Sequence, residues 1–144
     1  MSIDLRTACV AQWKMDETGG TFVADSSGNG NNGTSANTIA SAAGKIGGAF
    51  SWGQPNDAID TNSTFQSVFR NSFSIAMWAK PSHGTPPNDD AYFGAADEDT
   101  GSEIYLLHLT NGRFQFAYSE GEHKIVTTPA VVNSTILLSL YIIV

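Results

Sequence analysis

The 144-residue sequence is poor in cysteine, in charged residues and in basic residues. Its one cysteine, Cys9, has no partner for an internal disulfide and forms no Cys-x-x-Cys pair, which excludes a disulfide scaffold and a zinc site built from such pairs. Charged residues make up 15% of the chain, below the ~25% of ordinary globular domains, which argues against a coiled coil or a charged disordered tail. Seven basic against fourteen acidic residues give a net charge of −7, which repels phosphate and argues against a nucleic-acid partner.

The sequence also lacks a long apolar run. The longest covers residues 136–144, and these nine residues fall short of the ~20 that a membrane-spanning helix needs. Residues 1–7 offer neither a basic start followed by an apolar stretch nor any other feature of a secretory signal. We therefore expect no membrane span and interpret residues 136–144 as a terminal strand.

Apolar and polar side chains alternate through much of the chain, which is typical of half-buried strands. The alternation predicts longer strands at residues 9–15, 73–80, 104–109, 113–118 and 123–128, and shorter ones at 21–24, 49–52, 57–60 and 91–95. Asn111 and Gly112 predict a tight type I′ hairpin, and helix is expected only as one turn near residues 64–70. Nine or ten short strands separated by Gly, Asn and Pro predict an all-β protein, an antiparallel two-sheet sandwich or jelly roll, as one domain over residues 1–144.

Five motifs follow one another along the chain. They are WKMDETGG at residues 13–20, DSSGNGNNGT at 25–34, GKIGGAFSW at 44–52, NDAI at 56–59 and FSIAMWAKP at 73–81. In this order and with these gaps, the series resembles the laminin-G-like domains of the concanavalin A-like lectin/glucanase superfamily over about residues 11–135. The resemblance implies a two-sheet antiparallel jelly roll, in agreement with the strand pattern. It implies glycan or protein binding more often than one defined activity.

The end of the sequence departs from that family. Such domains continue beyond the position of Ser134 and Thr135 with a Trp-His strand, further strands and a closing strand that carries an acidic residue. We therefore expect a sandwich that is incomplete after about residue 135, through truncation or a shifted reading frame. Residues 136–144 are apolar on both faces, so they are expected in or beside the interface of a homo-oligomer. The alternative is a central strand of the chain's own sandwich.

The loop after residue 24 has the first half of a calcium-loop pattern. Asp25, Ser27 and Asn29 stand at alternate positions, and Gly30 follows them. A turn that needs glycine and asparagine for positive φ angles explains the same residues. Many domains that resemble this one hold calcium at this loop, together with an acidic residue on the closing strand. The candidate cofactor is therefore calcium, with Asp25, Asn29 and Asn32 as candidate ligands.

Catalytic patterns are absent from the sequence. Glycoside hydrolysis needs two carboxyl groups ~5–10 Å apart, and the Glu-x-Asp-x-x-Glu strand pattern of related glucanases does not occur. The nearest acidic cluster, at residues 97–99, is typical of a solvated turn. We therefore name no catalytic residue. Three aromatic residues are candidates to stack on a sugar: Trp78 on the polar side of its predicted strand, and Tyr92 and Tyr105 near the acidic turn.

These features favour a non-catalytic carbohydrate-binding or adhesion module. By resemblance, its place is outside the cell or on a cell or virion surface, and its partner is a glycan or a surface protein. The alternative is a structural or interaction domain of a surface or virion appendage, and a glycosidase fragment ranks third.

Overall fold

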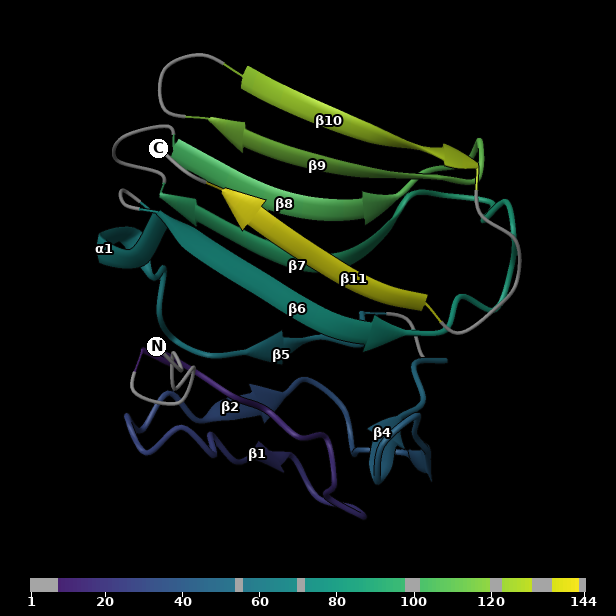
Figure 1. Ribbon diagram of the computed structural model, residues 1–144. Coiled ribbons are helices and arrows are strands. Elements are labelled where there is room, and N and C mark those ends of the chain that lie inside the picture. Colours follow the sequence, from purple (N-terminus) through teal and green to yellow (C-terminus); the bar gives the residue numbers. More distant parts are fainter. Residues whose placement is uncertain are drawn as a thin grey trace, which may run out of the picture. The chain divides into compact units, whose positions relative to one another are not determined.

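The computed structural model describes residues 8–53, 56–69, 72–97, 102–119, 123–130 and 136–142. In this part of the chain, eleven β-strands and one four-residue helix are present, and every pairing between the strands is antiparallel (Figure 1). The all-β prediction is confirmed. No helix of the described residues is long and apolar enough to cross a membrane. The chain divides into two compact units, Met1–Ser63 and Thr64–Val144.

The first unit, Met1–Ser63, contains very short strands. A three-stranded sheet has the order β1-β2-β5, and β3 pairs with β4 in a hairpin. The strands are β1 (Phe22–Val23), β2 (Gly33–Ser35), β3 (Ser41–Ala43), β4 (Gly48–Phe50) and β5 (Ile59–Asp60). The sequence pattern located β1, β4 and β5 but missed β2 and β3. Gly33 is needed in β2, because a Cβ at this position would overlap the side chain of Ile59 on the neighbouring strand.

The predicted strand at residues 9–15 is wrong. Its only ladder contact among the described residues is an isolated bridge between Trp13 and Asp25. Met15 has a φ of 59°, a left-handed conformation that ends the extended backbone. The carbonyl oxygens of Cys9 and Val10 accept hydrogen bonds from side-chain amides instead of from a neighbouring strand. The alternating residues therefore form an extended segment in which the carbonyl oxygens of Cys9 and Val10 are hydrogen-bonded by side chains and not by a neighbouring strand.

The second unit, Thr64–Val144, contains longer strands. A four-stranded sheet has the order β10-β9-β8-β7, β11 pairs with β6, and the helix α1 precedes β6 (Figure 1). The elements are α1 (Gln66–Phe69), β6 (Phe73–Ala79), β7 (Asp90–Asp97), β8 (Ser102–His108), β9 (Arg113–Ser119), β10 (His123–Ala130) and β11 (Ile136–Ile142). The predicted helical turn and the strands of this half are confirmed. The apolar C-terminal run is a strand paired with β6 over seven residues.

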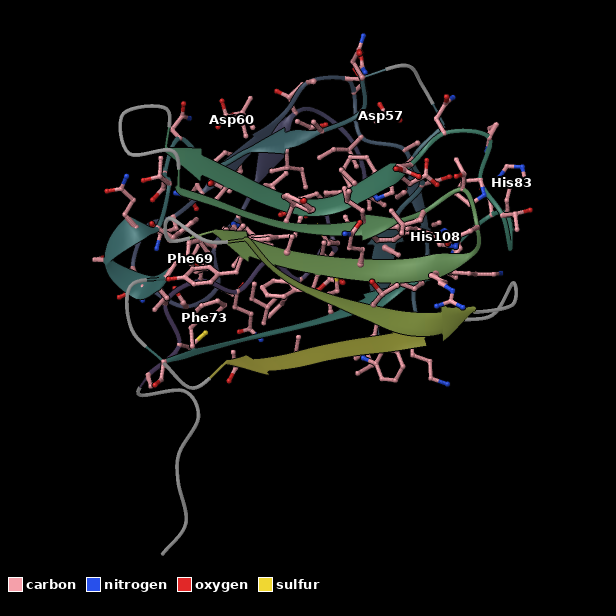
Figure 2. The ribbon with its side chains drawn as sticks, turned by 90° about the horizontal axis from the view of Figure 1, so that it is seen from above. Asp57, Asp60, Phe69, Phe73, His83 and His108 are labelled. Carbon is pink, nitrogen blue, oxygen red and sulfur yellow. The ribbon has the colours of Figure 1, made fainter. Side chains whose placement is uncertain are left out.

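The core of the second unit joins β6 to the four-stranded sheet. Phe73, Ile104 and Phe116 are buried, and partly buried side chains pack around them: Val68, Phe69, Ile75, Phe93, Ala95, Leu106 and Tyr118. Phe69 of α1 meets Phe73 edge to face, with ring centroids 5.0 Å apart (Figure 2). Along β6 the buried and half-buried positions alternate with exposed ones, so the predicted period of two is confirmed.

The hairpin between β8 and β9 has a different turn from the predicted one. Leu109 and Gly112 close it, with hydrogen bonds from the Gly112 N–H to the Leu109 carbonyl oxygen (2.8 Å) and from the Leu109 N–H to the Arg113 carbonyl oxygen (2.8 Å). Gly112 has a φ of 76°, whereas Asn111 is not among the positive-φ residues. A type I′ turn needs positive φ at both central residues, so this is a three-residue loop that ends in a left-handed glycine.

His108 is buried in an apolar environment. It is 1% exposed, and its ring stacks on Phe114 with centroids 4.7 Å apart and planes 8° apart. Tyr92 meets the same two rings edge to face. Neither ring nitrogen of His108 has a hydrogen-bond partner among the described residues. An unpaired buried polar atom lowers the free energy of unfolding. His108 therefore packs as a core side chain, but its two unpaired nitrogens destabilise the fold.

Replacing His108 with leucine is expected to leave the free energy of unfolding unchanged or to raise it by about 1 kcal/mol, because the unpaired nitrogens are removed. Urea denaturation measures this. The control is Ile104→Ala on the same strand and face, which should cost about 2–5 kcal/mol. A loss above 2 kcal/mol in His108→Leu would show that the imidazole has a partner in solution.

Candidate functional site

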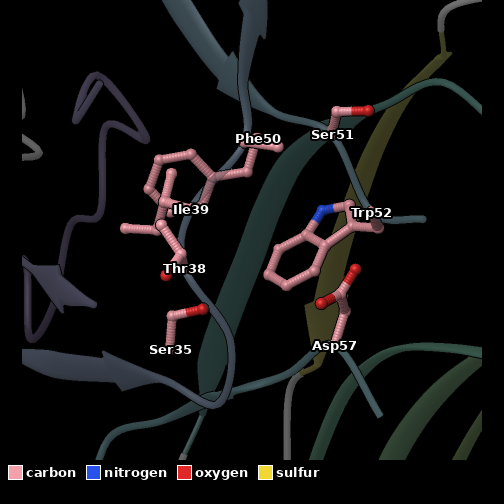
Figure 3. Close-up of a pocket in the computed structure, with 8 residues that line it drawn as sticks. Ser35, Thr38, Ile39, Phe50, Ser51, Trp52 and Asp57 are labelled. Atoms are coloured by element: carbon pink, nitrogen blue, oxygen red, sulfur yellow. The ribbon is translucent and has the colours of Figure 1, made fainter. Parts of the chain in front are cut away.

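A small hollow in the first unit lies beside an exposed tryptophan (Figure 3). Its lining consists of Ser35, residues 38–40, residues 50–52 and Asp57. The volume of the hollow is about 10 Å³, which is room for one water molecule. The hollow therefore encloses no ligand, and what it offers is the surface around its mouth.

Trp52 forms the exposed side of this hollow, with 51% of its surface accessible. Phe50 and Trp52 are two residues apart, so the strand direction carries both side chains to one side. Their rings meet edge to face with centroids 6.1 Å apart. The Ser51 N–H donates to the Ala40 carbonyl oxygen at 2.7 Å and extends the pairing of the hairpin past β4. A half-buried phenylalanine and a backbone hydrogen bond thus hold the indole in place at the surface.

Asp57 supplies a carboxylate beside the indole (Figure 3). Its Oδ1 accepts a hydrogen bond from the Asn37 side-chain amide at 2.9 Å, and its Oδ2 accepts one from the Gly53 N–H at 2.8 Å. These bonds tie the loop after β2 to the segment that carries Trp52. An aromatic face, a fixed carboxylate and nearby hydroxyl groups form a surface for a ligand that is apolar on one face and polar at its rim.

Sequence reasoning missed this site. Trp52 ends a predicted strand, and strand periodicity assigns a residue to a face without showing which face meets solvent. The available signal was the Ser-Trp-Gly sequence at the strand end, where a large apolar residue is followed by a turn residue. Asp57 and Asn37 are twenty residues apart, and only the fold brings them together.

The Asp25 loop is held by a dense hydrogen-bond network. The Asp25 Oδ1 accepts from the N–H groups of Gln12 (2.9 Å) and Ser27 (2.8 Å). The Asp25 Oδ2 accepts from the Ser27 hydroxyl (2.8 Å) and from the Asn31 N–H (2.9 Å). Burial would raise the pKa of this carboxyl, but the four hydrogen bonds outweigh it and lower the pKa from 3.8 to about 2.

The other two candidate calcium ligands belong to the same network. The Asn32 Oδ1 accepts from the Asp25 N–H at 2.9 Å, and the Asn29 amide donates to the carbonyl oxygens of Cys9 (2.8 Å) and Val10 (3.0 Å). The structure thus brings Asp25, Asn29 and Asn32 together in one loop. The side-chain oxygens of Asp25 and Asn32 already accept hydrogen bonds from the protein. A calcium ion fits this arrangement only if it displaces those hydrogen-bond donors. Calcium at this loop stays a prediction.

The three predicted sugar-stacking residues lie on three strands of the second unit. Trp78 is on β6, 45% exposed, on the side away from the core residues of that strand. Tyr92 is half-buried on β7 and packs on Phe114 with centroids 5.4 Å apart, and burial together with Asp90 raises its pKa. Tyr105 is half-buried on β8, where it alternates with core residues. The structure does not bring the three onto one face. The acidic cluster at residues 97–99 lies largely outside the described residues.

The comparisons with known proteins add one structural neighbour. No family model matches the chain, and no curated protein matches it. The chain is similar to residues 221–444 of an S-layer domain-containing protein from Clostridium thermocellum ATCC 27405, in a crystal structure at 2.1 Å resolution. The TM-score is 0.64 at 19% sequence identity, over 85% of this chain and 58% of that chain. This likeness shows a shared fold, and the chain spans little more than half the length of its neighbour.

Asp25→Ala is expected to lower the free energy of unfolding at pH 7 by about 1–3 kcal/mol, because four donors lose their acceptor. The folded pKa of about 2 lies below the ordinary 3.8, so the ionised carboxylate stabilises the fold fully above pH 4. That contribution is lost as the pH falls from about 4 to 2. Urea midpoints of both proteins should therefore converge over this range, and a constant gap would contradict the assignment.

The same two proteins test calcium. Bound calcium would raise the melting temperature of the parent protein by mass action, and Asp25→Ala would abolish the rise. If the loop is held by hydrogen bonds and binds no calcium, the parent protein should melt at the same temperature with calcium and with a chelator. The described geometry favours that result.

Proposed function

We propose that this protein is a non-catalytic carbohydrate-binding module and that Trp52 is the centre of its binding site. One observation carries the proposal: an indole that is 51% exposed is held against Phe50 beside the Asp57 carboxylate. Sugars present C–H groups on a ring face and hydroxyl groups around the rim. An aromatic platform with polar groups at its edge matches both features.

The proposed location is a cell or virion surface. The neighbour of similar fold is an S-layer domain-containing protein, which supports a surface location. We further propose that the antiparallel sheets of this chain belong to a two-sheet jelly roll, as the resemblance to laminin-G-like domains implies. The core between β6 and the four-stranded sheet supports this architecture for the second unit.

A second candidate function is a structural domain that assembles with copies of itself. The observation that favours it is β11, an apolar sequence segment whose ladder partner among the described residues is β6 alone. A strand with one partner presents backbone N–H and carbonyl groups along its other edge, and such an edge can pair with a second chain. Self-association along β11 and sugar binding at Trp52 would use residues of different units.

Trp52→Ala is expected to weaken binding to an immobilised polysaccharide at least tenfold, because the stacking face is lost. A polysaccharide array followed by titration against the best binder measures this. Trp78→Ala is the matched variant: it removes another exposed indole, with 45% exposure, from the other unit.

The array result is decisive in either direction. Weak binding by Trp52→Ala with full binding by Trp78→Ala supports the Trp52 site. The opposite pattern would assign the site to β6, and silence of the parent protein on every glycan would reject carbohydrate binding and leave the structural role.

Self-association predicts a mass of at least twice the 15.3 kDa chain mass by light scattering at low micromolar concentration. Proline in place of Leu138, in the middle of β11, should reduce that mass, because proline removes a backbone donor and is poorly tolerated within a sheet. A monomer of the parent protein at this concentration would reject the assembly.

A further inference from the structure

We infer that the Trp52 site takes internal units of an uncharged polysaccharide, lying across the indole, and discriminates against chains that carry uronate or sulfate groups. The inference rests on the proposed function and names the ligand class of the same site. It follows from two properties of the site, its shape and its charge.

The shape of the site excludes recognition of a single enclosed sugar. The hollow of about 10 Å³ holds a water molecule but no sugar ring. Sites that capture a small ligand whole are pockets of ~300–1,000 Å³ that bury most of its surface. The accessible part of this site is the exposed indole of Trp52, so a ligand lies on it with both ends open to solvent. A sugar unit within a chain fits such a platform as well as a terminal one does.

The chemistry of an indole face selects the kind of sugar. A β-linked glucose, xylose or N-acetylglucosamine unit carries its ring substituents equatorially, so its axial C–H groups cover both ring faces. Such a face is flat and apolar enough to stack on an aromatic ring. A chain of these units repeats the face at every sugar and adds contacts with residues beside Trp52, which one sugar cannot reach.

The charge of the site selects against anionic polysaccharides. The Asp57 carboxylate lies beside the indole, and its hydrogen bonds to Asn37 and Gly53 keep it there (Figure 3). The whole chain carries a net charge of −7. A uronate or sulfate group on the stacked sugar would approach this carboxylate, and like charges placed together at an interface are unfavourable. Uncharged hydroxyl groups meet no such repulsion.

The test compares the parent protein on immobilised neutral and anionic polysaccharides, with β-glucan, xylan and chitin against polygalacturonate and alginate. At low salt, we expect the best neutral polymer to bind at least about tenfold more tightly than either uronate polymer. A hexasaccharide of the best binder should compete at least tenfold better than its monosaccharide. Asp57→Asn should reduce the ratio of the affinity for the best neutral polymer to the affinity for the uronate polymers. In the parent protein, 1 M salt should reduce the same ratio through screening.

The outcomes separate this inference from the proposed function. Equal or tighter binding to the uronate polymers, or equal competition by monosaccharide and hexasaccharide, overturns the inference while carbohydrate binding stands. Binding to no polymer in the panel rejects both. If Asp57→Asn fails to fold, as judged by its far-ultraviolet circular dichroism, the salt dependence of the parent protein decides the charge argument alone.

Discussion

Carboxylates that accept hydrogen bonds from backbone N–H groups hold the first unit together. Its strands are only two or three residues long, so the ladders satisfy few backbone groups. Backbone hydrogen bonds between loops satisfy some of the other groups. Carboxylates satisfy more of them: Asp16 accepts from Gly48, Glu17 from Ala24, and Asp57 from Gly53. The excess of acidic residues therefore has a structural role here, besides its effect on the partners that the chain can approach.

The candidate site is one product of this arrangement. Asp57 fixes the loop after β2 against the segment that follows β4, and that segment carries Trp52. The same kind of interaction holds the Asp25 loop, where one carboxylate accepts hydrogen bonds from three residues. The Asp57 carboxylate lies beside an exposed aromatic ring, whereas the Asp25 carboxylate is surrounded by the groups that donate hydrogen bonds to it. This difference is why we place ligand binding at Trp52.

The sequence predicted the second unit better than the first, for a physical reason. Long strands such as β6 bury every other side chain, and this period is visible in the residue order. The first unit depends on bonds between residues far apart, such as Asn37 with Asp57, which leave no periodic trace. Asp25, Asn29 and Asn32 were predicted as calcium ligands from their spacing, and the structure shows them in one hydrogen-bonded loop. Spacing alone does not distinguish a cation site from a network of N–H donors. The hairpin turn at Gly112 differed from the predicted type because the loop has three residues.

The central claim, that ligand contacts Trp52, is tested most directly by the indole N–H signals in a ¹H–¹⁵N spectrum. The chain has three tryptophans and therefore three such signals. The Trp13 indole N–H donates to the Asn31 carbonyl oxygen at 2.8 Å, which makes it an internal reference away from the proposed contact. On titration with a soluble neutral β-glucan, contact at Trp52 predicts a saturable shift of the Trp52 signal while those of Trp13 and Trp78 stay in place. A saturable shift of Trp78 with an unmoved Trp52 signal would contradict it.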